Sequence, residues 1–234
     1  MAGHSKWANI KHRKERSDKK KGKLFSRIAK EIISAVKQGG SDIKTNTKLK
    51  LALQKAKDVN LPNDVIERNI KKASSRDQSD FINMSYELYG YGGVGIFVDI
   101  MTDNKNKISS EIRIATNKCG GNIATPGAVA FNFDRKGIIK IEKNLISEDE
   151  LFMKVSELGA LDFYLEDDFY VIVTKPEDLH VVIEGVGLKV EASLEMIPKT
   201  YVECSDEDTE SNIKLIEFLE NLDDVDAVYH NMKV

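Results

Sequence analysis

The chain has 234 residues, of which 41% are hydrophobic, so it is long enough for one large domain or for two or three small ones. Its longest apolar run, from Val94 to Met101, contains Asp99 and is too short to cross a membrane, which argues against a membrane protein. Cys119 and Cys204 stand far apart and outside any CxxC pattern, so we expect reduced thiols in a cytoplasmic protein.

The formal net charge of −3 conceals a strong asymmetry along the chain. Residues 1–76 contain 21 Lys and Arg against 7 Asp and Glu, whereas residues 77–234 contain 14 against 31. A basic segment joined to an acidic body indicates that one region binds a polyanion and the other does not. No apolar segment follows the basic start, so we predict no secretory signal. Its excess of Lys over Arg and its two acids make a mitochondrial presequence the less favoured alternative.

Positive charge is densest between Ala2 and Lys23, a segment called the arm below, where nine Lys and Arg accompany two acids. Only Trp7 and Ile10 are large apolar residues there, too few to form a core. Because cations neutralise phosphates and a tryptophan can stack on an unpaired base, we predict that the arm binds nucleic acid. The alternative is a solvated tail with Trp7 packed against the next helix. The cations of the arm are Lys6, Lys11, Arg13, Lys14, Arg16, Lys19, Lys20, Lys21 and Lys23.

Three helices are predicted between residues 22 and 75, followed by a polar linker over residues 74–80. Gly39-Gly40 ends the first helix, and Pro62 suits the first turn of the third. Arg27 lies on a polar face of the first helix and extends the basic surface beyond the arm. The apolar faces consist of Leu24, Ile28, Ile32 and Val36 in the first helix, Leu49, Leu53 and Ala56 in the second, and Val65, Ile66, Ile70 and Ala73 in the third.

Beyond the linker the hydrophobic pattern changes to a period of two, which indicates strands. Over residues 135–199 the predicted order is β-α-β-β-α-β, the ferredoxin-like arrangement, with Ser147 and Glu150 as a capping box at its first helix. The predicted ranges are strands 86–89 and 94–100, helix 106–118, strand 137–141, helix 148–158, strands 161–166 and 168–174, helix 177–186, strands 188–197 and 200–204, helix 208–221 and strand 225–233.

These elements predict an α+β fold. We interpret residues 1–80 as the arm plus an all-α three-helix domain. Residues 81–134 and 200–234 form one discontinuous α+β domain, and residues 135–199 form a ferredoxin-like domain inserted into it. The alternative is a plain string of small units.

The sequence contains only weak matches to motifs for cofactor binding, metal binding or catalysis. Gly90–Gly95 fits the G-x-G-x-x-G pattern, but a strand follows where a dinucleotide site needs a helix, so we favour a tight turn. A terminal Ala2-Gly3-His4 is able to hold Cu(II) or Ni(II), which we interpret as incidental. We predict no cofactor, no metal, no catalytic residue and no small-molecule substrate.

Two further groups of basic residues lie in the acidic body. They are Arg135-Lys136 in a turn and Lys105, Lys107 and Arg113 on a helix. We interpret both groups as solvated surface rather than as a second contact with a polyanion.

The motif AGHSKWANIKHRK at the start of the chain resembles the YebC/PmpR-type family. The likeness continues through GKLFSRIAKEI, LALQKAKDVNLPNDVIERNIKK, YELYGYGGVGIFVDIMTDNKNK and GGNIATPGAVAFNFDRKG, and it covers nearly the whole chain. The resemblance implies a cytoplasmic protein with an all-α N-terminal domain and two α+β domains, the last inserted into the middle one. It also implies nucleic-acid contact at the matching positions Lys6, Trp7, Lys11, His12, Arg13 and Lys14. Two departures are Tyr91, where proline is usual, and Ala124–Ala128, where relatives tend to have Gly-Thr-Ser-Gly-Ser.

Members of this family are described as DNA-binding transcriptional regulators. Others, including mitochondrial translational activators of a cytochrome oxidase subunit, are described as ribosome-associated factors that ease elongation through proline runs. The resemblance and the charge layout together predict a non-enzymatic, cytoplasmic regulator of gene expression that binds DNA, ribosomal RNA or transfer RNA. A ribosome-associated translation factor is the alternative, and an enzyme or a pure protein-interaction module are the rival classes.

Overall fold

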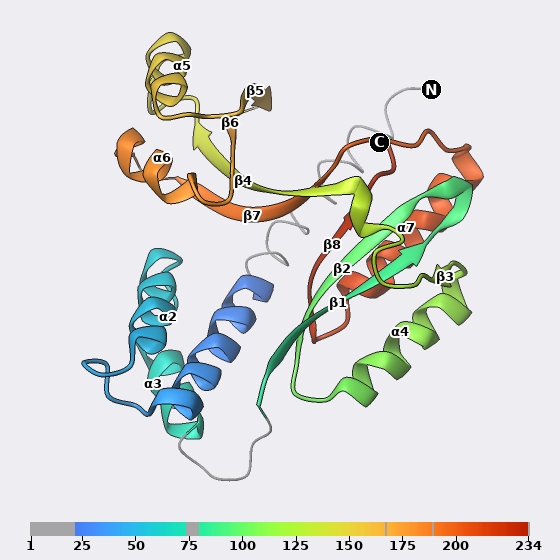
Figure 1. The fold of residues 1–234 in the computed structure, drawn as a ribbon, viewed down its shortest axis with the longest axis horizontal. Helices are drawn as coiled ribbons and strands as arrows, with labels where there is room; N and C mark the ends of the chain where they lie inside the picture. The colour runs from blue at the N-terminus through green and yellow to red at the C-terminus, as the bar shows by residue number, and fades with distance from the viewer. Residues whose placement is uncertain (1–21, 74–79, 167, 189, 234) are drawn as a thin grey trace. The chain divides into compact units, whose positions relative to one another are not determined.

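The computed structural model of the chain describes residues 22–73, 80–166, 168–188 and 190–233 (Figure 1). They fall into two compact units. The first contains the described residues up to Tyr86, together with Val98–Cys119 and Lys214–Val228. The second contains Glu87–Phe97, Gly120–Ile213 and the chain from Tyr229 onward. None of the described helices is both long and apolar enough to cross a membrane.

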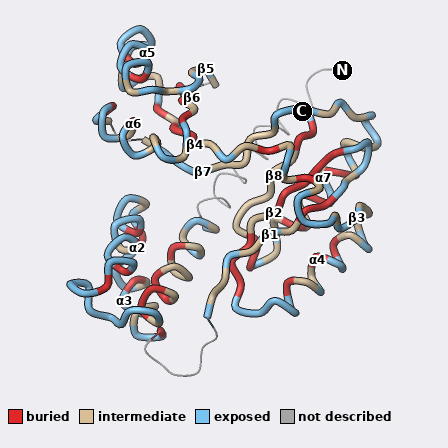
Figure 2. The backbone as a smooth tube through the Cα atoms, viewed as in Figure 1, coloured by how far each residue is buried: buried red, intermediate tan, exposed pale blue. Residues whose placement is uncertain are grey.

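Three helices open the described chain, as predicted: the first helix (residues 22–39), α2 (Thr47–Asp58) and α3 (Asn63–Ala73). Their apolar faces meet in one core, whose buried members appear red in Figure 2 and include Ile28, Ile32, Leu49, Ala56 and Ile66. The helical pattern of the sequence therefore identified the inward faces, because each helix must bury its apolar stripe. Leu24 is the exception: it was predicted on the apolar face of the first helix but is 42% exposed.

Asn46 joins the first helix to α2. Its buried side chain accepts the N–H of Leu49 at 3.0 Å as the N-cap of α2. The same amide donates to the carbonyls of Ala35 at 2.8 Å and Gly40 at 2.7 Å. A Cβ at Gly39 would lie 2.7 Å from the Asn46 nitrogen, so only glycine fits at the end of the first helix.

The first sheet has the strand order β3-β1-β2-β8. Gly92 and Gly93, with φ of 64° and 82°, lie in the turn between β1 and β2 and adopt the left-handed region that favours glycine. A strand follows this turn, which confirms the interpretation of Gly90–Gly95 as a tight turn between two strands. The elements of this region are β1 (Ile82–Tyr89), β2 (Gly95–Thr102), α4 (Lys105–Cys119), β3 (Asn122–Ile123), α7 (Asp206–Glu220) and β8 (Val225–His230).

The second sheet has the antiparallel order β5-β6-β4-β7, the ferredoxin-like order expected for β-α-β-β-α-β. Ile139 and Ile172 lie opposite each other on one face and pack with Leu151 of α5 and Val182 of α6. The predicted α+β class is therefore confirmed. The elements are β4 (Phe133–Glu142), α5 (Glu148–Glu157), β5 (Asp162–Glu166), β6 (Phe169–Thr174), α6 (Leu179–Val186) and β7 (Glu191–Pro198). The division into three domains stays a prediction.

Three local predictions are wrong. Residues 200–204 form no strand, and Val202 makes only an isolated bridge to Met232. The reason is that Lys199 and Thr200 form hydrogen bonds with Asn132 instead of continuing a strand ladder. Arg135-Lys136 lies within β4 rather than in a turn, paired with Met196 and Glu195. Ser147 occupies the N-cap of α5, but its side chain makes no capping hydrogen bond, so there is no capping box.

Candidate nucleic-acid interface

Most of the predicted nucleic-acid-binding residues lie outside the described residues. These are Lys6, Trp7, Lys11, His12, Arg13, Lys14, Arg16, Lys19, Lys20 and Lys21. Only Lys23 and Arg27 can be placed, and both belong to the first helix. Their contacts show which portion of the basic surface is already occupied within the molecule.

Lys23 and Arg27 contact the segment that leads from α7 into β8. The Lys23 ammonium donates to the carbonyl of Leu222 at 3.2 Å and to that of Val225. Burial lowers the pKa of Lys23, although Glu220 and Asp226 pull it upward. The Arg27 guanidinium lies 3.6 Å from a carboxylate oxygen of Asp226. Both predicted contacts with nucleic acid stay predictions, and both side chains have intramolecular partners in this structure.

Asp224 is the centre of this contact. Lys30 of the first helix donates to one oxygen of its buried carboxylate at 3.1 Å. Lys107 of α4 and the Thr102 hydroxyl donate to the other oxygen, at 3.3 and 3.1 Å. Burial alone would raise the pKa of Asp224, but Lys30, Lys107 and Thr102 outweigh it and hold the pKa below its usual range. Lys30 also donates to the carbonyl of Met101 at 2.7 Å.

The remaining cations of the helical segment differ in whether they have partners. Lys48 donates to Gln38 at 2.6 Å, and Lys55 bridges to Glu31 at 2.8 Å. Both partners belong to the first helix, so this side of α2 is internally satisfied. Four exposed lysines make no ion pair with any residue that the structure describes: Lys44, Lys50, Lys57 and Lys71. These are the described cations most available to phosphates.

Glu87 is a second buried carboxylate, and no sequence pattern had indicated it. It lies on β1, is 7% exposed, and accepts backbone N–H groups from Gly127 and Val129 at 2.6 Å and from Ala130 at 2.7 Å. Burial alone would raise the pKa of Glu87, but the three donors outweigh it and the pKa is lowered. The only signal in the sequence was the acid at a strand position, which does not identify donors 40 residues away.

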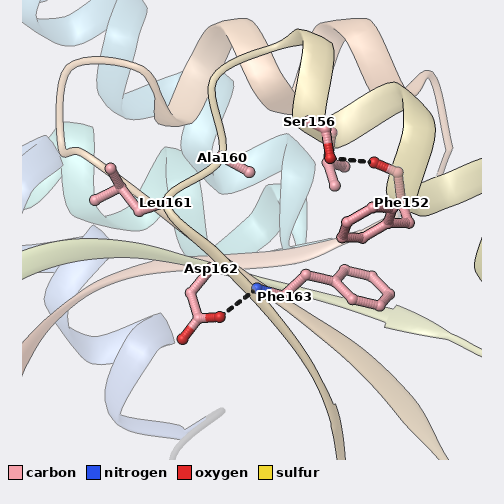
Figure 3. A pocket seen from close by; sticks show the side chains of 7 residues that line it. Phe152, Ser156, Ala160, Leu161, Asp162 and Phe163 are labelled. Atoms are coloured by element: carbon pink, nitrogen blue, oxygen red, sulfur yellow. Dashed lines mark hydrogen bonds between the residues drawn. The ribbon is translucent and has the colours of Figure 1, made fainter.

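A small pocket of about 260 Å³ lies at α5 and β5 (Figure 3). Five of its seven lining residues are apolar, and the rings of Phe152 and Phe163 lie 5.7 Å apart. The one carboxylate that lines it, Asp162, accepts the backbone N–H of Phe163 at 2.8 Å. No cluster of three or more metal-ligating side chains occurs among the described residues. The pocket thus combines apolar side chains with the polar groups of Ser156 and Asp162.

The fold and these contacts define an α+β protein in which a basic helical segment precedes two sheets. The chain belongs to the TACO1/YebC family. Residues 5–76 match the description "TACO1/YebC protein N-terminal domain", and residues 81–232 match "TACO1/YebC second and third domain". The family resemblance expected from the N-terminal motif is thereby confirmed.

Three curated relatives are each named a "Probable transcriptional regulatory protein". The chain is 64% identical to one from Protochlamydia amoebophila, over all of this chain and 97% of the relative. It is 55% identical to one from Chlamydia felis and 53% identical to one from Chlamydia trachomatis, over 99% of this chain and all of each relative. A crystal structure of a conserved hypothetical protein from Aquifex aeolicus has a TM-score of 0.76 at 38% identity, covering 91% of this chain and 90% of that one.

Replacing Asp224 with Asn should destabilise the first unit. The substitution removes the charge that compensates Lys30, whose side chain is only 12% exposed. We expect a loss of about 2–3 kcal/mol in the free energy of unfolding, measured by urea denaturation. Asp64→Asn is the matched control, because Asp64 pairs with Arg68 on an exposed helix face and should cost under about 0.5 kcal/mol. Equal effects of the two substitutions would contradict the central role of Asp224.

Replacing Glu87 with Gln should lower stability in a pH-dependent way. The ordinary pKa is 4.5 and the folded pKa is lower, so the carboxylate stabilises the fold fully above about pH 4.5. The stability difference between wild type and Glu87→Gln should be about 1–3 kcal/mol at neutral pH and should shrink as the pH falls through the folded pKa. Thermal denaturation across this range tests it. Glu177→Gln is the matched control: it also removes one carboxylate, but at an exposed position, and should change stability by less than about 0.5 kcal/mol.

Proposed function

We propose that this chain is a non-enzymatic, cytoplasmic regulator of gene expression that binds nucleic acid through its basic N-terminal region. Its curated relatives are named as transcriptional regulatory proteins, which supports a role in gene expression. Cys119 and Cys204 form no disulfide with any described residue, which fits a reducing compartment.

The observation that carries the proposal is the surplus of exposed cations in the helical segment. Residues 22–73 contain 12 Lys and Arg against 5 Asp and Glu. Two of those acids are already engaged, Glu31 by Lys55 and Asp64 by Arg68. Lys50 and Lys57, seven residues apart, lie on one face of α2 and add to the charge of the arm. An exposed helical surface with many cations and few local acids is suited to a phosphate backbone.

A ribosome is the second candidate partner, and the charge of the remaining chain favours it over a bare duplex. Residues 77–234 contain 14 Lys and Arg against 31 Asp and Glu, so most of the chain is repelled by an extended polyanion. A particle that presents both RNA and basic protein can accommodate both halves. In this alternative the chain acts as a translation factor, and RNA rather than promoter DNA is the ligand.

Salt titration of the purified full-length chain tests nucleic-acid binding. We expect the affinity for labelled RNA or DNA to fall steeply with salt, because cations displace condensed counterions from the phosphates. Deleting residues 2–21 should remove most of the affinity, since eight of the predicted cations lie there. A flat salt response would contradict the proposal and favour a protein-interaction module. Crosslinking in cells followed by sequencing of bound RNA and DNA then separates ribosome from promoter.

Two pairs of lysines on α2 provide a matched test of the helical surface. The double variant Lys50→Ala/Lys57→Ala removes two cations that make no ion pair with any described residue. The negative slope of log affinity against log salt should therefore become shallower by roughly 1.4–1.8. Lys48→Ala with Lys55→Ala removes two cations that already contact Gln38 and Glu31, so it should change the slope less. Equal slopes for both double variants would argue against a contact through Lys50 and Lys57.

A further inference from the structure

We propose that Phe131 is a stacking platform for an unpaired base of a single-stranded nucleic acid, with Lys199 and Arg135 facing the adjoining phosphates. The inference rests on the proposed function and adds a second contact, far in sequence from the arm. It concerns residues of the second unit alone. Four observations carry it: the exposure of the ring, the fixed backbone beneath it, the local charge and the polarity of the neighbouring surface.

Phe131 is 72% exposed, whereas its neighbour Phe133 is 5% exposed and belongs to a core with Phe97 and Val129. The two phenylalanines are only two residues apart. The ring of Phe133 is buried in that core, whereas the ring of Phe131 is exposed to solvent. A large exposed aromatic ring gains nothing for the fold from the hydrophobic effect, because its surface is not buried. A ring kept in water on an ordered segment is suited to binding.

The backbone on the N-terminal side of Phe131 is fixed by the Glu87 carboxylate. Glu87 accepts the N–H groups of Gly127, Val129 and Ala130, so the residue immediately before Phe131 is held by a buried charge. Val129 is also buried, at 3% exposure. Charge-assisted hydrogen bonds of this kind are stronger than neutral ones, so the loop has little freedom to turn the ring inward.

The C-terminal side is fixed by the segment after β7. Asn132 donates to the carbonyl of Thr200 at 3.1 Å and accepts the Thr200 hydroxyl at 2.7 Å. The N–H of Lys199 donates to the carbonyl of Asn132 at 2.7 Å. Both neighbours of Phe131 are therefore held, which reduces the entropy lost when a base stacks on the ring.

The charge around Phe131 is opposite to that of the surrounding chain. The Lys199 ammonium donates to the carbonyl of Phe131 at 2.8 Å, and its side chain is 49% exposed. Arg135 is exposed and has no ion pair with any residue in the described ranges of the chain. Asp134 is the one acid in residues 125–136 and 198–201, and it pairs with Lys199 at 3.3 Å and Lys136 at 3.8 Å. These two segments therefore contain three cations and one acid, and a second acid, Glu195, lies opposite Lys136 across the β4–β7 pair.

The neighbouring surface favours nucleic acid over a protein partner. Protein hot spots centre on apolar patches that exclude water. The exposed residues next to Phe131 in the loop and the paired segment are Thr125, Pro126, Gly127, Thr200 and Tyr201, and the Tyr201 ring is itself 59% exposed. Other large exposed apolar groups, Phe152, Met153 and Leu161, lie at α5 and β5. Exposed aromatic rings with nearby cations are the arrangement that proteins use to bind single strands by stacking.

The test uses the full-length chain and an unstructured, labelled RNA of about 20 nucleotides, longer than a typical single-strand site. Phe131→Ala should weaken binding about tenfold, and Phe131→Leu should weaken it similarly, because leucine keeps apolar area but has no π-face. Phe131→Trp should retain or improve affinity. Phe152→Ala is the matched control: it removes another exposed ring, 53% exposed, and should leave affinity unchanged. The melting temperature of each Phe131 variant should match wild type, since the ring is exposed.

A local readout complements affinity. The chain has one tryptophan, so Phe131→Trp in a Trp7→Phe background leaves a single tryptophan, at position 131, which can be excited selectively over the seven tyrosines. Bound RNA should quench its fluorescence if bases stack there.

The outcomes separate this inference from the proposed function. A wild-type chain that binds neither RNA nor DNA in a salt-dependent manner overturns both. If the wild-type chain binds, Phe131→Ala loses no affinity and the tryptophan at position 131 is not quenched, the inference alone is overturned. The exposed ring of Phe131 would then be assigned to binding a protein partner. Full affinity in Phe131→Leu also overturns it, because the contact is then apolar rather than stacked.

Discussion

The carboxylate of Asp224 receives hydrogen bonds from Lys30 of the first helix, Lys107 of α4 and the hydroxyl of Thr102. A buried carboxylate is costly unless donors surround it, and here two ammonium groups compensate it. The first helix depends on this contact, together with those of Lys23 and Arg27, for its place beside the segment before β8. The cations of the helical segment are thereby divided into a set with internal partners and a set, including Lys50 and Lys57, that remains available to a ligand.

The same physical requirement operates at Glu87, but with a different result. Its donors are backbone N–H groups of one loop rather than side chains of several helices. Because the carboxylate satisfies three donors at once, it fixes the loop that ends at Phe131. One buried acid thus positions a helix and the other presents an exposed ring. Both have a lowered pKa for the same reason, since favourable donors outweigh the effect of burial.

Membership in the TACO1/YebC family places this chain among relatives named as transcriptional regulatory proteins. The charge pattern adds a physical constraint to that name. A basic N-terminal region and an acidic remainder cannot both lie along one uniform duplex, whereas a mixed surface of RNA and protein suits both. The cationic surroundings of Phe131 would give the acidic remainder a location at which a single strand can still be held.

Local sequence patterns were sufficient to predict the α+β class, the three helices and the ferredoxin-like order, because hydrophobic periods of 3.6 and 2 are local properties of the chain. They also marked the arm, since charge density needs no coordinates. The partners of the buried acids emerged only from the folded chain: Lys30 and Asp224 are 194 residues apart, and Glu87 lies 40 or more residues from its loop donors. The errors at residues 200–204 and Arg135-Lys136 share this cause, because strand pairing depends on partners brought close by folding and no local pattern specifies those partners. The error at Ser147 is different: the expected capping partner is three residues away, and the structure gives no reason why the bond is not made.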